Sequence, residues 1–281
     1  MANATKIFVV LDPSTMEQVS LDWGEKVALD LKEHRGTDAQ LHVYCCINHK
    51  SSVVAENQDF GATEQATTER VAQWVNRLVM RTRELGIQVK TEVEWNENWR
   101  EAIVAATKRQ ESDLVVKNLT QHARLVRWVR DTSDWRLLRD CECPVLLVKT
   151  GRAYGINKIL VAIKHTDDEQ YTGANKSIVE RAQRLADDFG ASLHAVTCYS
   201  PGNHPDRQRF ADSFGLERNQ VSALMGIPEK VIASVADEVG ADLLVIARVA
   251  RAESANVLGD MARKVVDQIN TDILVLPMLD E

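Results

Sequence analysis

The chain repeats one pattern of short apolar runs in its two halves, and this repeat limits the folds that it can adopt. Four runs of the first half end at Leu11, Val43, Val116 and Val148, and their counterparts end at Ile163, Ala195, Val245 and Val275. Apolar runs of this length between helix-like stretches are typical of parallel strands buried on both faces. Two copies of the pattern predict two α/β domains in one polypeptide.

The composition excludes several classes of protein. A chain of 281 residues, 44% of them hydrophobic, can form two cores of ordinary domain size. Its formal net charge of −7 argues against a specific nucleic-acid partner, whose binding normally needs a basic face. No apolar run approaches the ~20 residues that cross a bilayer, and residues 1–6 lack the apolar stretch of a signal peptide. Because five cysteines are an odd number at low density, we expect a cytoplasmic protein with reduced thiols.

The two halves differ in one helix. Leu41 matches Leu193, and Cys46 matches Cys198, with the same difference in residue number. Further along the chain Asp113 matches Asp242, and there the difference in residue number is smaller. The second half has therefore lost a segment between its second and fourth strands. In the first half this interval holds a predicted amphipathic helix, residues 64–85; in the second half only residues 205–214 fill the same place.

Each half alternates strands and helices, which predicts a doubly wound parallel sheet of five strands. The turn-rich stretch 150–155 separates them, so we expect domains at residues 1–150 and 156–281. Ligands of such sheets bind beyond the carboxyl ends of the strands, where the strand order reverses. The residues that end the first and fourth strands of each half are therefore the candidate site.

Several motifs lie where they do in a known family. Asp12 follows the first strand, Asp113 opens an Asp-Leu-Val-Val strand, and Cys143-Pro144 opens the last strand of the first half. With the segment 117–149, this arrangement resembles the universal stress protein family in its tandem, E-type form. The resemblance implies an adenine nucleotide alpha hydrolase-like, Rossmann-like fold and a role in stress response.

The resemblance also implies how the two halves associate. Universal stress proteins dimerise through their last strand, and pairing covers an exposed sheet edge. We therefore predict that residues 145–149 and 273–277 pair as an internal pseudo-dimer. This arrangement removes the need for a partner subunit and leaves further oligomerisation open.

The nucleotide-binding loop of the family is degenerate in both halves. Nucleotide-binding members carry Gly-x2-Gly-x9-Gly-(Ser/Thr) after the fourth strand, because the backbone must approach phosphate oxygens closely. In the first half these positions hold Asn118, Gln121 and Asp131, followed by Thr132; in the second half they hold Ala247, Ala250 and Gly259, followed by Asp260. An aspartate beside a phosphate adds repulsion. We therefore predict no cofactor, with ATP as the alternative.

The two candidate sites have opposite charge. In the first half Asp12 is expected to face Lys117, either as a ligand site or as an internal ion pair that fills an abandoned one. In the second half Lys164, Arg248 and Arg251 would suit a small anionic ligand, unless the arginines point to solvent or pair with nearby carboxylates.

Neither a metal site nor a catalytic arrangement is predicted. His42, Cys45, Cys46 and His49 have the spacing of zinc ligands, but an extended strand holds His42 and Cys46 too far apart for one ion. No nucleophile or paired carboxylate lies at a candidate site. We therefore expect a non-catalytic stress-response protein that binds a ligand or a partner protein. The alternatives are an ATP-binding switch or weak ATPase, and a carrier of an anionic amphiphile in the second domain.

Overall fold

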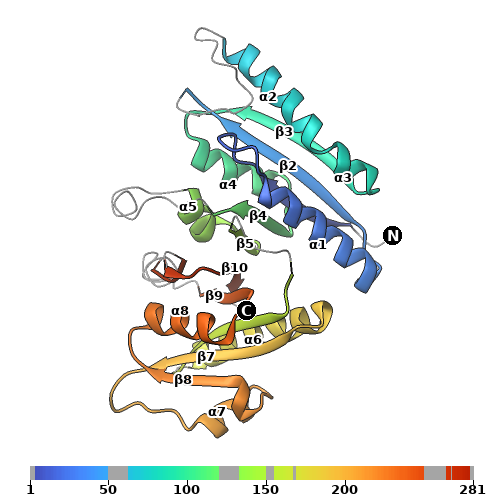
Figure 1. Cartoon of the computed structure of the whole chain (residues 1–281). Coiled ribbons are helices and arrows are strands. Elements are labelled where there is room, and N and C mark those ends of the chain that lie inside the picture. The colour runs from blue at the N-terminus through green and yellow to red at the C-terminus, as the bar shows by residue number, and fades with distance from the viewer. Residues whose placement is uncertain are drawn as a thin grey trace. The chain divides into compact units, whose positions relative to one another are not determined.

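The computed structural model describes residues 4–49, 63–119, 133–149, 155–166, 169–249, 264–266 and 268–278. It divides into two compact units, Met1–Gly151 (unit 1) and Arg152–Glu281 (unit 2), and each is described by itself. Figure 1 labels most of the helices and strands of both.

Unit 1 is a five-stranded parallel sheet with helices between its strands. Its elements are β1 (Thr5–Val10), α1 (Val19–Arg35), β2 (Ala39–Ile47), α2 (Glu64–Leu78), α3 (Met80–Glu84), β3 (Gln88–Trp95), α4 (Trp99–Arg109), β4 (Leu114–Asn118), α5 (Ser133–Asp140) and β5 (Val145–Val148). The strand order is β3-β2-β1-β4-β5, and all neighbours are parallel. The order reverses between β1 and β4, which fixes the place where a ligand would bind.

Unit 2 repeats the same topology. Its elements are β6 (Lys158–Lys164), α6 (Glu169–Phe189), β7 (Ser192–Tyr199), α7 (Arg207–Ser213), the 3-10 helix η1 (Arg218–Gln220), β8 (Val221–Met225), α8 (Pro228–Val239), β9 (Leu243–Val249) and β10 (Asp272–Met278). Its order is β8-β7-β6-β9-β10, again parallel throughout, with the reversal between β6 and β9. The predicted tandem of doubly wound sheets is confirmed.

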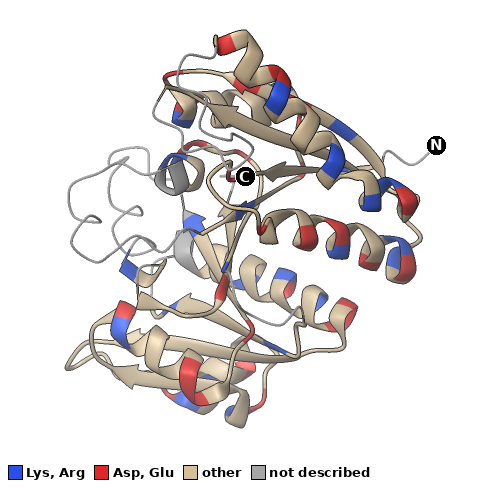
Figure 2. Cartoon of the chain, turned by 45° about the horizontal axis from the view of Figure 1, so that its top comes forward, with Lys and Arg blue, Asp and Glu red and all other residues tan. Residues whose placement is uncertain are grey.

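The apolar runs form the central strands of both sheets. Ile7, Phe8 and Val9 of β1 are fully buried, as are Leu160 and Val161 of β6. In Figure 2 the charged residues lie mainly on the helices and the connecting loops, whereas the strands are mostly uncharged. Helices therefore cover both faces of these strands, which is why their sequences are continuously apolar rather than alternating.

Helix α1 packs close to the sheet at a glycine. A Cβ atom added to Gly24 would lie 2.7 Å from Cγ2 of Val9 and 3.4 Å from Cδ2 of Leu41. The helix ends at Gly36, whose φ of 61° is the left-handed conformation common after helix C-termini. Gly24 thus sets how closely α1 approaches β1 and β2.

The two units differ most where the sequence predicts a lost helix. In unit 1, α2 buries Val71, Trp74 and Val75 against the sheet, and the helical stretch breaks at Val79 before α3. In unit 2 only α7 and η1 occupy this interval. The predicted difference is confirmed, although one continuous helix over 64–85 is not, because α2 and α3 are separate helices. Within the described residues, no helix is both long and apolar enough to span a membrane.

Candidate functional site

The candidate site of unit 1 is the first rim, which we define as Asp12, Lys117 and Asn118 at the carboxyl ends of β1 and β4. Parallel pairing places Lys117 directly beside Val10, two residues before Asp12. The carboxylate of Asp12 accepts hydrogen bonds from the backbone N–H (2.9 Å) and the hydroxyl (2.5 Å) of Ser14. The expected pairing of Asp12 with Lys117 stays a prediction.

A glutamine side chain fixes the backbone of the first rim. The amide nitrogen of Asp12 donates to Oε1 of Gln18 at 3.0 Å, and Nε2 of Gln18 donates to the carbonyl oxygen of Asp12 at 2.7 Å. Gln18 is 6% exposed and stands at the N-cap position of α1. Both backbone groups of Asp12 are thereby hydrogen-bonded within the protein, which holds the backbone of the first rim at this residue.

The inner part of the first rim is buried and polar. Lys117 is 9% exposed, and its Nζ donates to the carbonyl oxygen of Asn118 at 3.0 Å. Asn118 is the last residue of β4 and is also buried. Within the part of the chain that the structure describes, Oδ1 of Asn118 accepts no hydrogen bond. A buried acceptor without a donor costs stability.

The second rim, which we define as Lys164, Ala247 and Arg248, has the same backbone support. The amide nitrogen of Lys164 donates to Oδ1 of Asn175 at 3.2 Å, and Nδ2 of Asn175 donates to the carbonyl oxygen of Lys164 at 2.6 Å. Asn175 is 8% exposed and lies in α6. We call each of these two-bond contacts an amide clamp. The same clamp therefore holds Asp12 in one unit and Lys164 in the other.

The charged side chains of the second rim lie nearer to solvent than Lys117 does. Lys164 is exposed and Arg248 is half-buried. Arg248 lies within β9, paired in register with Pro277, and not after the strand as the sequence suggested, because pairing with β10 continues as far as Val249. Ala247 precedes it in the same strand. Asp131, Thr132, Arg251, Gly259 and Asp260 fall outside the described residues.

An aromatic group adjoins the second rim. The ring of His165, next to Lys164, packs edge to face against Phe210, with the ring centroids 6.1 Å apart. Phe210 packs in the same way against Phe214, with the centroids 5.1 Å apart. Both phenylalanines lie on or next to the short helix α7 and are half-buried. Sequence reasoning noted the shortened segment but missed this contact, because the residues are far apart in the chain.

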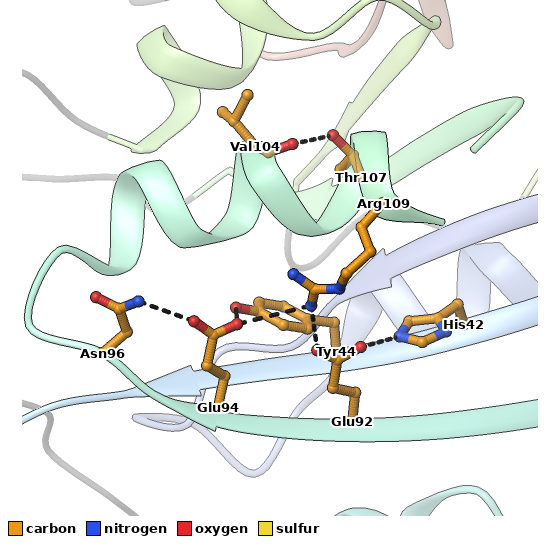
Figure 3. A network of polar contacts seen from close by, with 8 residues as sticks. All are labelled: His42, Tyr44, Glu92, Glu94, Asn96, Val104, Thr107 and Arg109. Atoms are coloured by element: carbon orange, nitrogen blue, oxygen red, sulfur yellow. Dashed lines mark hydrogen bonds and ion pairs between the residues drawn. The ribbon is translucent and has the colours of Figure 1, made fainter. Parts of the chain in front are cut away.

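Figure 3 shows a second polar network of unit 1, on the sheet face that α4 covers. Nε2 of His42 lies 2.8 Å from Oε2 of Glu92, and the hydroxyl of Tyr44 donates to Glu94 at 2.7 Å. Arg109, at the end of α4, bonds to Glu92 and lies 3.8 Å from Glu94. The network ties α4 to β2 and β3.

Burial governs the ionisation of this network. Desolvation lowers the pKa of His42, and the hydrogen bond with Glu92 only partly offsets it. Desolvation likewise raises the pKa of Tyr44, whose bond to Glu94 acts in the same direction. His194 occupies the matching position of unit 2, where its Nε2 lies 2.9 Å from the hydroxyl oxygen of Ser222, and its pKa is also lowered by burial. Glu92, which the sequence did not single out, is thus the partner of the histidine considered as a zinc ligand.

Comparison with known proteins identifies the family. The Universal stress protein family model matches residues 3–149. Universal stress protein E from Photorhabdus laumondii is 26% identical over 98% of this chain and 96% of its own length. The Escherichia coli K12 protein of the same name is 27% identical over 98% and 95%. A crystal structure of a universal stress protein from Pseudomonas aeruginosa superimposes with a TM-score of 0.75 at 25% identity, covering 98% of this chain and 93% of that one.

The two lines of comparison agree with the duplicated fold. The family model covers more than half of the chain, and the E-type proteins match across both units. The chain therefore belongs to the universal stress protein family, in its tandem E-type form.

Proposed function

We propose that this stress protein works by binding rather than by catalysis, and that an anionic ligand or an acidic partner protein binds at the second rim. The observation that carries the proposal is the pair of amide clamps. Each clamp bonds both backbone groups of the rim residue at or just beyond the end of the first strand of its unit, and the two rims differ in the side chain presented. One presents the carboxylate of Asp12, and the other presents the ammonium of Lys164.

The first rim fits a structural role. Asp12 already accepts two hydrogen bonds from Ser14, and the buried ammonium of Lys117 donates to a backbone carbonyl. A carboxylate that is satisfied internally has little to offer an anionic ligand, which it would repel. Binding at this rim would also require access to a lysine that is 9% exposed.

The second rim fits an anion. Lys164 is the last residue of β6, and Arg248 is the residue before the last of the neighbouring strand β9. Lys164 is exposed and Arg248 is half-buried, so the second rim carries two cationic side chains. Charge-assisted hydrogen bonds from such groups are the ordinary means by which proteins hold carboxylates and phosphates. Because the clamp already holds the backbone of Lys164, less conformational entropy is lost there when a ligand binds.

A matched pair of substitutions tests the proposal. We expect native mass spectrometry of the purified protein to show a bound anion, or affinity capture to show an acidic partner, that is lost in Lys164→Glu and retained in Asp12→Asn. Retention in Lys164→Glu, or loss only in Asp12→Asn, would overturn the assignment to the second rim. Folding of both variants is checked by circular dichroism.

A nucleotide switch is the less favoured alternative. The first loop position of the family motif is the buried Asn118 in unit 1 and Ala247 in unit 2, and each has a side chain where close backbone approach calls for glycine. Stoichiometric ATP in native spectra recorded with ATP and magnesium would replace our proposal with this alternative.

A second candidate function has an observation of its own. Exposed apolar side chains lie at and just beyond the end of β8, the strand that follows the shortened α7 in the chain: Leu224 is 42% exposed, Met225 60% and Ile227 52%. Together with Lys164 they favour an anionic amphiphile as the ligand, its head group at the cation and its chain on the apolar residues.

We assign the protein to the cytoplasm in either case, since all five cysteines are free thiols.

A further inference from the structure

Two thiols lie within contact distance in the loop that joins α5 to β5. The Sγ atoms of Cys141 and Cys143 are 3.4 Å apart, while a disulfide bond measures ~2.05 Å. Cys141 is 2% exposed and Cys143 is half-buried. A shift shared between the two side chains would bring the sulfur atoms to bonding distance.

The backbone on both sides of the pair is held in place. The amide nitrogen of Cys141 donates to the carbonyl oxygen of Leu137 at 3.0 Å, and the carbonyl oxygen of Pro144 accepts from Val115 at 2.9 Å. The intervening residue, Glu142, forms an ion pair with Lys108 at 2.8 Å. The two thiols therefore face each other as a consequence of the fold and not of a loose loop.

The other cysteines of the chain are arranged differently. Cys45 and Cys46 are consecutive residues of β2, so their side chains point to opposite faces of the sheet. Cys198 lies in β7 of unit 2. Among the five cysteines, all of which the structure describes, Cys141 and Cys143 are the pair with a sulfur–sulfur contact.

We propose that Cys141 and Cys143 are a redox-active dithiol that hydrogen peroxide converts into an intrachain disulfide. This inference goes beyond the proposed function, because it concerns a modification of unit 1 and does not involve either rim.

The chemistry follows from the unequal exposure of the two thiols. The thiolate of Cys143, the more accessible residue, attacks one peroxide oxygen, breaks the O–O bond and releases hydroxide, which takes up a proton to form water. The sulfur of Cys141 then attacks the resulting sulfenic acid, forms the S–S bond and displaces a second water. In total the two thiols lose two electrons and two protons to the peroxide, which is reduced to two molecules of water.

The local environment sets the speed of this reaction. The hydrogen bond with Cys141 and burial both raise the pKa of Cys143, so little thiolate is present at neutral pH. We therefore expect slow oxidation by peroxide.

Peptide mapping tests the proposal on the wild-type chain. Trypsin places Cys141 and Cys143 together in residues 140–149, Cys45 and Cys46 in residues 36–50, and Cys198 in residues 185–207. After exposure of the native protein to peroxide and alkylation of the remaining thiols, peptide 140–149 should lack both alkyl groups and weigh two hydrogen atoms less than its reduced form. Treatment with dithiothreitol before alkylation should restore both alkyl groups.

Variants supply the controls. In Cys143→Ser, peroxide should no longer protect Cys141 from alkylation, whereas Cys198→Ser should leave the oxidation of peptide 140–149 unchanged. The proposal is overturned if peptide 140–149 keeps two alkylated thiols at peroxide exposures that oxidise Cys198, or if Cys143 stops at the sulfenic acid or goes on to the sulfinic acid without a bond to Cys141.

Discussion

At the scale of single residues, Gln18 and Asn175 each satisfy both backbone groups of one strand-end residue. Neither was a candidate from the sequence, since an isolated amide side chain has no spacing that marks it. Each is more than nine-tenths buried, and replacing it removes one hydrogen bond from a backbone N–H and one from a carbonyl oxygen.

The amide clamp of unit 1 predicts a stability loss. Gln18→Ala should lower the free energy of unfolding by ~1–3 kcal/mol, because a part-buried backbone donor and acceptor each lose a hydrogen bond. Urea unfolding followed by circular dichroism measures the change. Gln40→Ala is the matched control, since the bond of Gln40 to Gln88 is exposed and 3.5 Å long; equal effects of the two substitutions would contradict the clamp.

Two glycines predict effects of opposite sign. Gly24→Ala should destabilise unit 1 by ~1–3 kcal/mol, because the new methyl group would lie 2.7 Å from the branched side chain of Val9. At Gly173, an exposed position of helix α6, an added Cβ meets no atom within 4 Å, so Gly173→Ala should stabilise unit 2 by up to ~1 kcal/mol. Thermal unfolding of both variants checks the signs, and destabilisation by both would show that the helix–sheet approach is not the cause.

The buried histidine of Figure 3 predicts how stability depends on pH. Burial lowers the pKa of His42 in the folded protein, whereas in the unfolded chain a histidine titrates near ~6.5. Between the two values the unfolded chain binds the proton more readily, so the free energy of unfolding should fall as the pH drops below ~6.5. His42→Gln should make this fall shallower in urea titrations. A folded-state pKa above ~6.5, measured by NMR, would reverse the sign and refute the prediction.

At the scale of elements, the sequence predicts the features that arise from residues close together in the chain. The buried face of α2, with Val71, Trp74 and Val75, follows from helical periodicity, and the strands follow from unbroken apolar runs. The contact of His42 with Glu92 joins residues on different strands, and its geometry depends on the parallel register of β2 and β3. No local pattern carries that information.

The strand ends show the same limit. The sequence predicted that Asp12, Lys117 and Lys164 lie at strand ends, because the runs stop there, and the structure places them at or just beyond the ends of β1, β4 and β6. The clamps and the contact of His165 with Phe210 arise from packing between strand ends and helices, so they required the structure.

The exposed end of β8 predicts a measurable surface property. Replacing Leu224 and Met225 by serine should reduce binding of dodecyl phosphate, measured by calorimetry, while changing the free energy of unfolding by less than ~1 kcal/mol, since both side chains are exposed. Met80→Ser is the control, because Met80 is 56% exposed in α3 of unit 1. Unchanged binding in the double variant, or an equal loss in Met80→Ser, would argue against this surface as the site.

At the scale of the whole molecule, duplication gives two units with their own sheets and cores. The second copy kept the strand order while it shortened one helical interval and replaced the acidic strand end with a cationic one. Sequence change at strand ends leaves the buried strands intact, so the two copies could diverge in what they bind without loss of fold.

The predicted association of residues 145–149 with residues 273–277 is tested by cutting the chain between the units. A protease site inserted after Gly151 interrupts the turn-rich stretch without altering either sheet. If the last strands pair, the halves should remain together in size-exclusion chromatography after cleavage, because backbone hydrogen bonds and buried apolar side chains hold them without the linker. Leu147 is a fully buried residue of β5. Leu147→Pro should release the halves, because proline removes a backbone N–H donor from the strand. Separate elution of two folded halves from the cleaved parent would contradict the predicted strand pairing and show that the linker alone joins the units.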